Sequence, residues 1–414
     1  VTNFRTGQLN SNNDLPFDFL QEVQISSETS AENSRALGGN INIVTRGGFD
    51  NWRGRIGVSF TPNNLQGKPN VVINRFGTNA GQIEFFQPAK DGGSGFFPTA
   101  TLSGPIVKEK LWFLASYSPQ IYRTTRSVDY FSSSNPANRT INETVRYESN
   151  VRTEQAFVRL DAQPSSSVRM FGTFLYNPII QDGALPLVNE GFAGVPQSAL
   201  GLRGADFLAT RGGRQNSNLV NGQIRWNVLN NFVLDFRAGR TFLNEKLDTY
   251  GIPRTTRYIC SVTNGGIPAG AGCSAGFQNI SSNFVRDYDA SVRTTFDANA
   301  FLLGINAFGR HNFKFGYQYN RLFNEVSEGY ADTGIIQLFY NIPITTLGIP
   351  VTPTAGNLGS GFLQRFGTVG EAKSTNQALF AQDSWNIKNR LTLNLGIRFE
   401  DETLPDYNRE INQK

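Results

Sequence analysis

Apolar and polar residues alternate along the chain from about Trp52 onward. A period of two predicts β-strands with one apolar and one polar face. The apolar positions of the first and last clear runs are Ile56, Val58 and Phe60, and Leu393, Leu395 and Ile397. On this basis we predict about eleven strands. They begin near Trp52, Pro98, Leu111, Glu154, Val168, Leu219, Phe232, Ala290, Asn312, Ser374 and Leu391.

The connections between the predicted strands are of two kinds. Short turns are predicted at 107–110, 163–167, 229–231, 309–311 and 388–390. Long connections rich in Gly, Asn, Ser and Pro are predicted at 63–97, 127–150, 177–215, 251–283 and 327–373. The two kinds alternate strictly, as periplasmic turns and extracellular loops do in outer-membrane barrels. A soluble β-sandwich would not be expected to place all its long connections on one side.

The first region of the chain, residues 1–51, has a different pattern. It contains a short predicted strand at Val23–Ile25, a helical turn at Ala31–Leu37 and a second strand at Ile41–Thr45. Two glycines, Gly38 and Gly39, break the chain before the second strand. We therefore divide the sequence into a small α/β unit at 1–51 and an all-β region at 52–414.

Composition narrows the class of protein. No stretch approaches the roughly 18 to 20 continuous apolar residues that a transmembrane helix needs. The net charge is +5, but basic and acidic residues are interleaved, which does not favour nucleic acid as a partner. One His, two Cys and one Met disfavour a metalloenzyme or a histidine-dependent hydrolase. Because Val1 opens no signal peptide and an open sheet edge is costly in a bilayer, we expect an internal segment of a longer barrel protein.

Several segments resemble a known family. The segment Gln21–Gly48, QEVQISSETSAENSRALGGNINIVTRGG, is similar to the closing motif of the plug domain in TonB-dependent receptors. The segments Leu102–Tyr117, Gly309–Tyr319 and Ala378–Glu400 are similar to barrel hairpins of the same family. Their amino-acid sequences are most similar to its Oar-like branch. The chain is thus identified as the C-terminal part of a plug domain (1–51) followed by the N-terminal half of a transmembrane β-barrel (52–414).

The resemblance implies a barrel of about 22 strands, closed by an internal plug, in the outer membrane of a bacterium. It implies active uptake of a scarce ligand, which could be a siderophore, cobalamin, a glycan or a peptide. It also implies outer-membrane lipid and the TonB–ExbB–ExbD complex as partners, with no enzyme activity, cofactor or nucleic acid. A passive porin or adhesive barrel and a soluble β-rich binding protein or enzyme are the alternatives. The plug argues against a passive pore, because such a pore has no need of a domain folded inside it.

Five residues of the plug motif are candidate structural residues: Arg35, Gly38, Gly39, Asn42 and Arg46. We expect the two glycines to let the backbone turn sharply, which we favour over a role in ligand binding. The two arginines could pair with lumen-facing acids such as Asp161, Asp235 or Glu400 and so seat the plug. A solvated plug surface is the alternative for both.

The remaining candidates lie in the all-β region. Cys260 and Cys273 fall in one predicted extracellular loop, where we expect a disulfide worth about 3 kcal/mol; two free thiols or a metal pair are the alternatives. His311 is predicted to be solvent-exposed in a short turn. Asp287 and Asp289 are a weak candidate for Ca²⁺ binding. Loop aromatic residues that would suit a bulky, partly apolar ligand are Phe96, Phe97, Phe192, Phe207, Phe339 and Tyr340.

Overall fold

The computed structural model describes most of the chain. The described residues are 19–26, 30–32, 40–75, 83–133, 135–193, 208–209, 211–250, 255–260, 286–330, 333–339, 360–388 and 390–403. Among them no helix is both long enough and apolar enough to cross a membrane.

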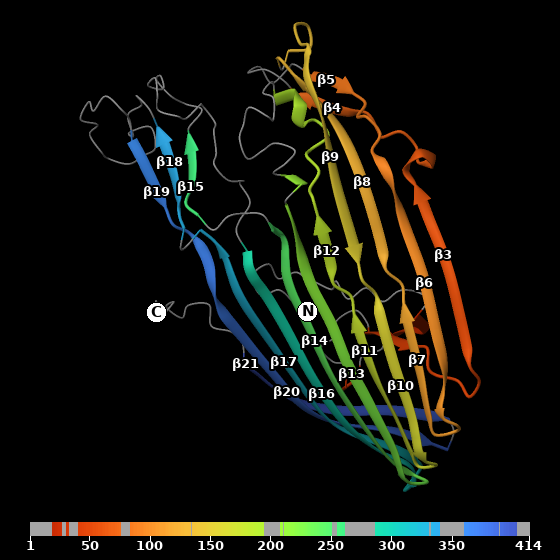
Figure 1. The fold of residues 1–414 in the computed structure, drawn as a ribbon. Helices are drawn as coiled ribbons and strands as arrows, with labels where there is room; N and C mark the ends of the chain where they lie inside the picture. Colours follow the sequence, from red (N-terminus) through yellow and green to blue (C-terminus); the bar gives the residue numbers. More distant parts are fainter. Residues whose placement is uncertain are drawn as a thin grey trace.

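The described chain is dominated by one strongly curved antiparallel sheet of fourteen hydrogen-bonded segments (Figure 1). In chain order these are β3 (Arg53–Pro62), β6 (Gly92–Val107), β7 (Leu111–Tyr117), β8 (Gln120–Phe131), β9 (Ile141–Thr153), β10 (Ala156–Ser165), β11 (Val168–Tyr176), β12 (Ile179–Asp182), β13 (Gly212–Leu229), β14 (Phe232–Tyr250), β16 (Arg286–Asn306), β17 (Arg310–Gly329), β20 (Gly367–Ile387) and β21 (Leu391–Thr403). When β7 and β8, β9 and β10, and β11 and β12 are each counted as one long strand, every strand pairs with its neighbours along the chain, so the sheet is a meander.

Three neighbouring strands of this meander are interrupted at the same height. The pairs β7–β8, β9–β10 and β11–β12 are each separated by two residues, at 118–119, 154–155 and 177–178. Backbone hydrogen bonds bridge the interruptions, from Ser118 to the carbonyl of Gln155 and from Glu154 to that of Pro178 (2.8 and 2.9 Å). Each pair is therefore one strand with a local bend. The fourteen segments make eleven long strands, which confirms the number predicted from the alternation.

The strict alternation of short and long connections is also confirmed. Short turns of two or three residues lie at 108–110, 166–167, 230–231, 307–309 and 388–390, and all gather at the lower end of the sheet in Figure 1. Three of these turns are tight enough to contain a non-glycine residue with positive φ: Glu109, Phe308 and Lys388. The connections at the opposite end are longer, and they include η2 (Asn63–Leu65), the β4–β5 hairpin (Val72–Arg75 and Ile83–Phe86) and η3 (Glu190–Ala193).

One predicted long loop is largely strand. We expected a loop at 127–150, but β8 continues to Phe131 and β9 begins at Ile141. The reason is a buried cluster on the inner face of this hairpin, in which Val128, Tyr130 and Tyr147 pack against Ala184 and Leu208. The hydroxyl groups of the two tyrosines lie 2.7 Å apart. Because this cluster buries their apolar side chains, β8 and β9 extend further into the region that was predicted to be a loop.

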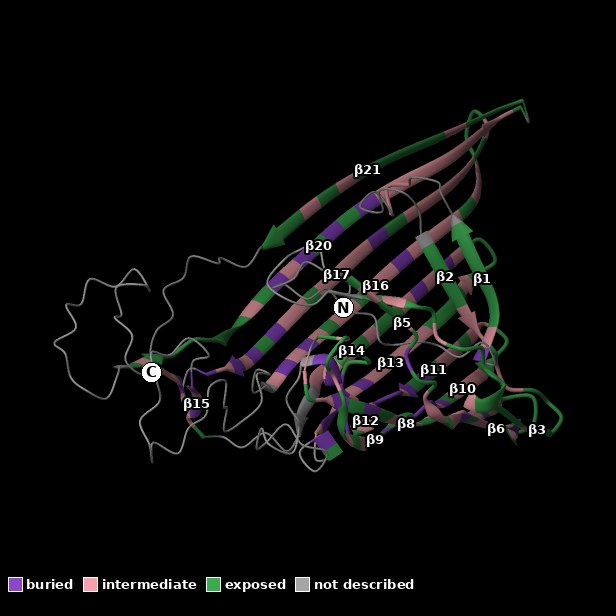
Figure 2. Ribbon diagram, turned by 90° about the horizontal axis from the view of Figure 1, so that it is seen from above, coloured by how far each residue is buried: buried purple, intermediate pink, exposed green. Residues whose placement is uncertain are grey.

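The alternation produces two chemically different faces. Outward positions are apolar and exposed, as at Ile56 (91% exposed) and Ile397 (73% exposed). Inward positions carry polar side chains that bond across strands: the Thr173 hydroxyl donates to Asn221 Oδ1 at 2.6 Å. Stripes of different exposure run along every strand of Figure 2. Apolar residues outside and polar residues inside are the arrangement of a membrane barrel and the reverse of a soluble β-domain.

A second small sheet carries Cys260. It contains β15 (Arg257–Cys260), β18 (Ile335–Phe339) and β19 (Ser360–Gln364), in that order. Cys260 is 1% exposed and disulfide-bonded. Its predicted partner, Cys273, lies outside the described residues, so the pairing stays a prediction.

The described loop aromatic residues do not form an open ligand surface. Phe192 is buried between Phe86 and Phe131, with ring centroids at 4.7 and 5.2 Å, and Phe339 is buried in β18. Phe97 packs against Tyr122, and Phe96 is exposed beside Phe60 on the outward face. Phe207 and Tyr340 lie outside the described residues. The four described aromatics thus serve packing or face outward, and a ligand platform that includes Phe207 and Tyr340 stays a prediction.

His311 was predicted to be exposed, and this is also wrong. It is the second residue of β17, and its side chain is only 14% exposed because the Trp385 and Phe313 rings stack on it at 5.1 and 5.4 Å. Its Nδ1 lies 2.7 Å from Asp383 Oδ2 and its Nε2 lies 2.8 Å from the Ala307 carbonyl oxygen. The Ala307 carbonyl oxygen and an ionised Asp383 carboxylate are both acceptors without a proton to donate. The geometry therefore suits an imidazole that carries a proton on each ring nitrogen.

The acidic pair Asp287 and Asp289 lies near the start of β16 and forms no cation site in the described part of the chain. Asp289 is buried and accepts a hydrogen bond from Asn324 at 3.0 Å, while the side chain of Asp287 lies outside the described residues. No group of three or more potential metal ligands occurs among the residues that the structure describes.

The N-terminal region forms a separate two-stranded antiparallel sheet. Its strands are β1 (Leu20–Ser26) and β2 (Asn40–Thr45), which confirms both predicted strands. Of the predicted helical turn, Ala31 and Glu32 form a turn, and 33–37 lie outside the described residues. Seen from above in Figure 2, β1 and β2 lie on the concave side of the large sheet.

Candidate functional site

The side chain of Phe19, just before β1, is buried in the inner face of the large sheet. It is 1% exposed and stacks on Phe157, with ring centroids 5.1 Å apart and an interplanar angle of 18°. Leu114 and Leu175 complete the buried cluster, and Leu219 packs against it. We call these four wall residues the Phe19 socket.

The socket forms because the strand register places its members at one height. Phe157 lies opposite Leu175, and Leu175 lies opposite Leu219, so three strands present apolar side chains side by side. They form an apolar island on an otherwise polar inner face. Burying a phenylalanine side chain in such a place contributes about 1.5 to 3 kcal/mol.

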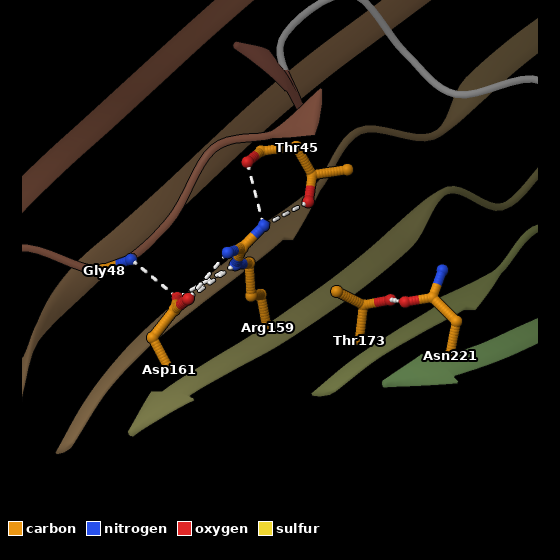
Figure 3. A network of polar contacts seen from close by, with 6 residues as sticks. All are labelled: Thr45, Gly48, Arg159, Asp161, Thr173 and Asn221. Carbon is orange, nitrogen blue, oxygen red and sulfur yellow. Dashed lines mark hydrogen bonds and ion pairs between the residues drawn. The ribbon is translucent and has the colours of Figure 1, made fainter. Parts of the chain in front are cut away.

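Next to the socket, β10 holds the N-terminal segment with a charged clamp formed by Arg159 and Asp161 (Figure 3). The Arg159 guanidinium donates to the Thr45 carbonyl oxygen (3.0 Å) and to Thr45 Oγ1 (2.8 Å). It also pairs with Asp161 at 2.7 Å, and Asp161 accepts a hydrogen bond from the backbone N–H of Gly48 at 3.2 Å. The guanidinium lies 4.2 Å from the centroid of the Phe171 ring. Because the two clamp residues are two positions apart in a strand, both side chains point to the inner face.

The backbone of the segment touches the wall at Gly48. A Cβ atom placed on Gly48 would lie 2.4 Å from Trp112 Cβ and 3.0 Å from the backbone of Phe113. The neighbouring Gly47 is less confined, because its Cβ would lie 3.1 Å from Asp161 Oδ2, a side-chain atom that can move. Trp112 Nε1 also donates to Asp50 Oδ1 at 2.6 Å. Gly48 is thus required by close approach to a strand backbone.

We expect Gly48→Ala to destabilise this contact by about 1 to 3 kcal/mol, because neither strand backbone nor Trp112 Cβ can move away without cost. The measurement is hydrogen exchange of the amides of residues 40–50 in the full-length protein. Gly47→Ala is the matched control, and it should change exchange much less. Equal acceleration in both variants would show that close packing at Gly48 does not fix the segment.

A second set of contacts comes from strands further along the wall. Lys314 on β17 forms an ion pair with Glu32. Arg398 on β21 donates from Nη1 to the carbonyl oxygens of Ala31 and Glu32 (3.3 Å each), and its Nε lies 2.9 Å from Glu400. The N-terminal segment therefore bridges two separated parts of the curved sheet, at β10 and at β17 and β21.

Two of the five candidate structural residues, Asn42 and Arg46, are described, and both make contacts within the N-terminal sheet. Arg46 donates from Nε to the Leu20 carbonyl oxygen at 3.0 Å, and Asn42 donates to Gln24 Oε1 at 3.2 Å, so both hold β2 to β1. The hypothesis that Arg46 pairs with wall acids is wrong. Arg35, Gly38 and Gly39 lie outside the described residues.

The three wall acids proposed as partners are engaged differently. Asp161 receives the Gly48 N–H and the Arg159 guanidinium. Glu400 pairs with Arg398, and Asp235 lies 2.9 Å from Arg237. The wall therefore supplies the cations and the segment supplies mainly carbonyl oxygens, the reverse of the predicted arrangement.

Sequence reasoning missed the residues that make the strongest contacts: Phe19, Arg159, Lys314 and Arg398. A usable signal existed for the last three. Each is a cation on the polar face of an alternating strand, where a charged side chain facing the interior of a barrel needs a partner. Phe19 carried no signal, because an aromatic residue before a short strand is common.

Taken together, the fold and the site define a membrane-barrel wall with a segment of the same chain fastened to its inner face. Residues 127–413 match the family model described as "Outer membrane beta barrel domain". The match covers more than half of the chain, and the chain belongs to this family. It is accordingly a protein of the bacterial outer membrane.

Individual relatives agree with this assignment. The chain is 26% identical to the TonB-dependent transporter Oar of Myxococcus xanthus over 94% of its own length and 40% of that protein's length. Among solved structures, it is similar to the outer membrane transporter YddB from Escherichia coli, with a TM-score of 0.59, 13% identity, and coverage of 94% of this chain and 44% of that one. A mutant of the ferric enterobactin receptor PfeA from Pseudomonas aeruginosa matches with a TM-score of 0.50, 10% identity, and coverage of 96% and 47%.

These relatives are transporters and receptors rather than enzymes. The two solved structures share the fold at low identity and show no more than the fold. The chain spans about two fifths of the length of the curated relative that it matches.

Proposed function

We propose that the protein carries out TonB-dependent active uptake of a scarce ligand across the outer membrane. In this proposal residues 1–51 are the C-terminal part of a plug domain, and residues 52–414 are the N-terminal half of the barrel. The observation that carries the proposal is the fastening of the segment before β3 to the inner wall by Phe19, Arg159, Lys314 and Arg398. A passive pore has no need of protein held in its lumen.

The contacts also suit a plug that must be held yet moved. Among the contacts of the described residues, the Phe19 socket is closed and apolar, and most of the others are hydrogen bonds and ion pairs whose side chains are partly exposed. Partly exposed ion pairs contribute about 0 to 1 kcal/mol each. Work delivered from the periplasm by the TonB–ExbB–ExbD complex could therefore displace the segment after one main apolar contact is broken. The relationship to a TonB-dependent transporter supports this coupling.

The cargo class stays open between a siderophore, cobalamin, a glycan and a peptide. The described loop aromatics are occupied in packing or face outward, so they do not select among these ligands.

The test of the function uses the full-length protein. In a planar bilayer the intact protein should conduct little, and removal of the whole plug domain should open a large water-filled channel. In cells, uptake of the native ligand should stop when TonB is removed or the proton gradient is collapsed, whereas binding of that ligand at the cell surface should persist. Unchanged uptake without TonB, or porin-like conductance of the intact protein, would instead favour a passive or adhesive barrel.

A further inference from the structure

Two arginines lie directly opposite each other on the inner face of the wall. Arg169 on β11 is the register partner of Arg225 on β13. Both have the same strand parity as Thr173 and Asn221, whose side chains bond on the inner face. Like charges at directly opposed positions destabilise a sheet. The arrangement therefore calls for a compensating group.

No acid in the described part of the chain pairs directly with either arginine. Neither guanidinium makes a hydrogen bond or an ion pair with any described residue. The acids nearby are engaged: Asp161 with Arg159, Asp235 with Arg237, and Asp50 with Trp112 Nε1. Each guanidinium has five N–H donors in a planar fork, so the pair offers a surplus of positive charge and of donors.

The two arginines line a cavity of about 560 Å³ between the wall and the segment at 47–50. Its aromatic walls are Phe49, Trp112 and Phe171. The lining also carries a third arginine, Arg159, and the two carboxylates Asp50 and Asp161, so the cations still outnumber the acids. A volume of this size lies within the range of about 300 to 1,000 Å³ that is usual for small-molecule sites. Aromatic surfaces around a cationic pair suit a ligand with an apolar or aromatic body and one anionic group.

We propose that this cavity binds a small organic anion, whose carboxylate or phosphate is held jointly by Arg169 and Arg225. Planar guanidinium groups match these anions through paired N–H donors, which gives stronger hydrogen bonds than neutral partners do. The site lies near the end of the wall that carries the short turns, since Arg169 is the second residue of β11. It is thus distinct from any site formed by the long connections. The proposal does not depend on TonB coupling, because binding can be measured on purified protein.

The test is calorimetric titration of the purified full-length protein with 4-bromobenzoate and, separately, with inorganic phosphate. Arg169→Gln and Arg225→Gln should each weaken binding of 4-bromobenzoate by about tenfold or more, since each removes charge-assisted hydrogen bonds. Neutral 4-bromobenzamide should not bind measurably. Binding of phosphate alone would identify a bare anion site, and stronger binding of the benzoate would support a site that also uses the aromatic walls.

Two controls make the result decisive. Arg123→Gln, at an exposed arginine on β8, should leave the affinity unchanged. Both cavity variants should unfold at the same temperature as the wild type or higher, because each relieves the repulsion of a like-charged pair. Bromine anomalous diffraction from co-crystals should locate the ligand between the two arginines. The proposal would be overturned if 4-bromobenzoate shows no saturable binding to the wild type, as expected when a carboxylate of the protein's own chain fills the site. Equal binding to the wild type and to all variants would also overturn it.

Discussion

Replacing Phe19 with alanine in the full-length protein should release the N-terminal segment from the wall. Phe19 fills a closed socket of Leu114, Phe157, Leu175 and Leu219, and its loss leaves an apolar cavity that the strands cannot collapse to fill. Truncation of a buried phenylalanine costs about 3 to 5 kcal/mol. A cost of 3 kcal/mol corresponds to roughly a hundredfold increase in the population of the detached segment.

Hydrogen exchange of the β1 and β2 amides is the direct readout, and leak conductance in planar bilayers is the functional one. Phe49→Ala is the matched control: Phe49 lies in the same segment, but the residue is 39% exposed, and its ring packs against the Arg53 guanidinium. That variant should change exchange little. If Phe19→Ala leaves exchange of β1 and β2 at the wild-type rate, the socket does not anchor the segment.

Burial of Phe19 contributes more to the free energy of holding the segment than the ion pairs do, because the charged groups are still partly solvated. Arg159 and Asp161 are 13% and 22% exposed, and Lys314 and Glu32 are 20% and 21% exposed. Water still reaches these groups, so removal of one partner leaves the other partly solvated and the net loss is small. The arginine and lysine contacts therefore determine where the segment sits. The socket supplies most of the free energy that keeps it there.

The fold was predictable from sequence because its signals are local. A strand in a barrel wall has lipid on one side and polar lumen on the other, so its alternation is set by the environment of each single strand. The run Leu393, Leu395 and Ile397 predicts its strand without knowledge of any neighbour. Tight turns are equally local, and all five were predicted within a few residues.

The site was not predictable in the same way, because it depends on pairings between strands. Arg159 reaches Thr45 only because β10 lies beside β7 and β11 and faces the segment, and no local pattern contains that information. His311 was misjudged for the same reason, since its cover comes from Trp385, a residue of the next strand. The extension of β8 and β9 beyond the predicted loop boundary likewise rests on Ala184 and Leu208, which are distant in sequence.

Ile224→Arg should destabilise the full-length protein in phospholipid vesicles by more than about 1 kcal/mol, because a lipid-facing cation costs about 2 to 4 kcal/mol at the bilayer midplane and about 0 to 1 kcal/mol at the interfaces. Ile224 is 44% exposed on the outward face, and its register partners are Met170 and Phe236, so the new charge would find no acid beside it. It lies five residues before the short-turn end of β13 at Leu229, so it lies between that end and the middle of the strand.

Arginine at position 223 tests the opposite face at the same depth. Gln223 points inward and donates to Asp235, so an arginine there keeps an acidic partner and meets the polar lumen. Its cost should be well below that of Ile224→Arg when the urea midpoints of the two variants are compared in vesicles. Because a strand alternates its side chains strictly, adjacent positions share depth and differ only in the face they occupy. Equal losses at 223 and 224 would mean that β13 does not separate lipid from lumen, and the inward placement of the whole N-terminal segment would lose its basis.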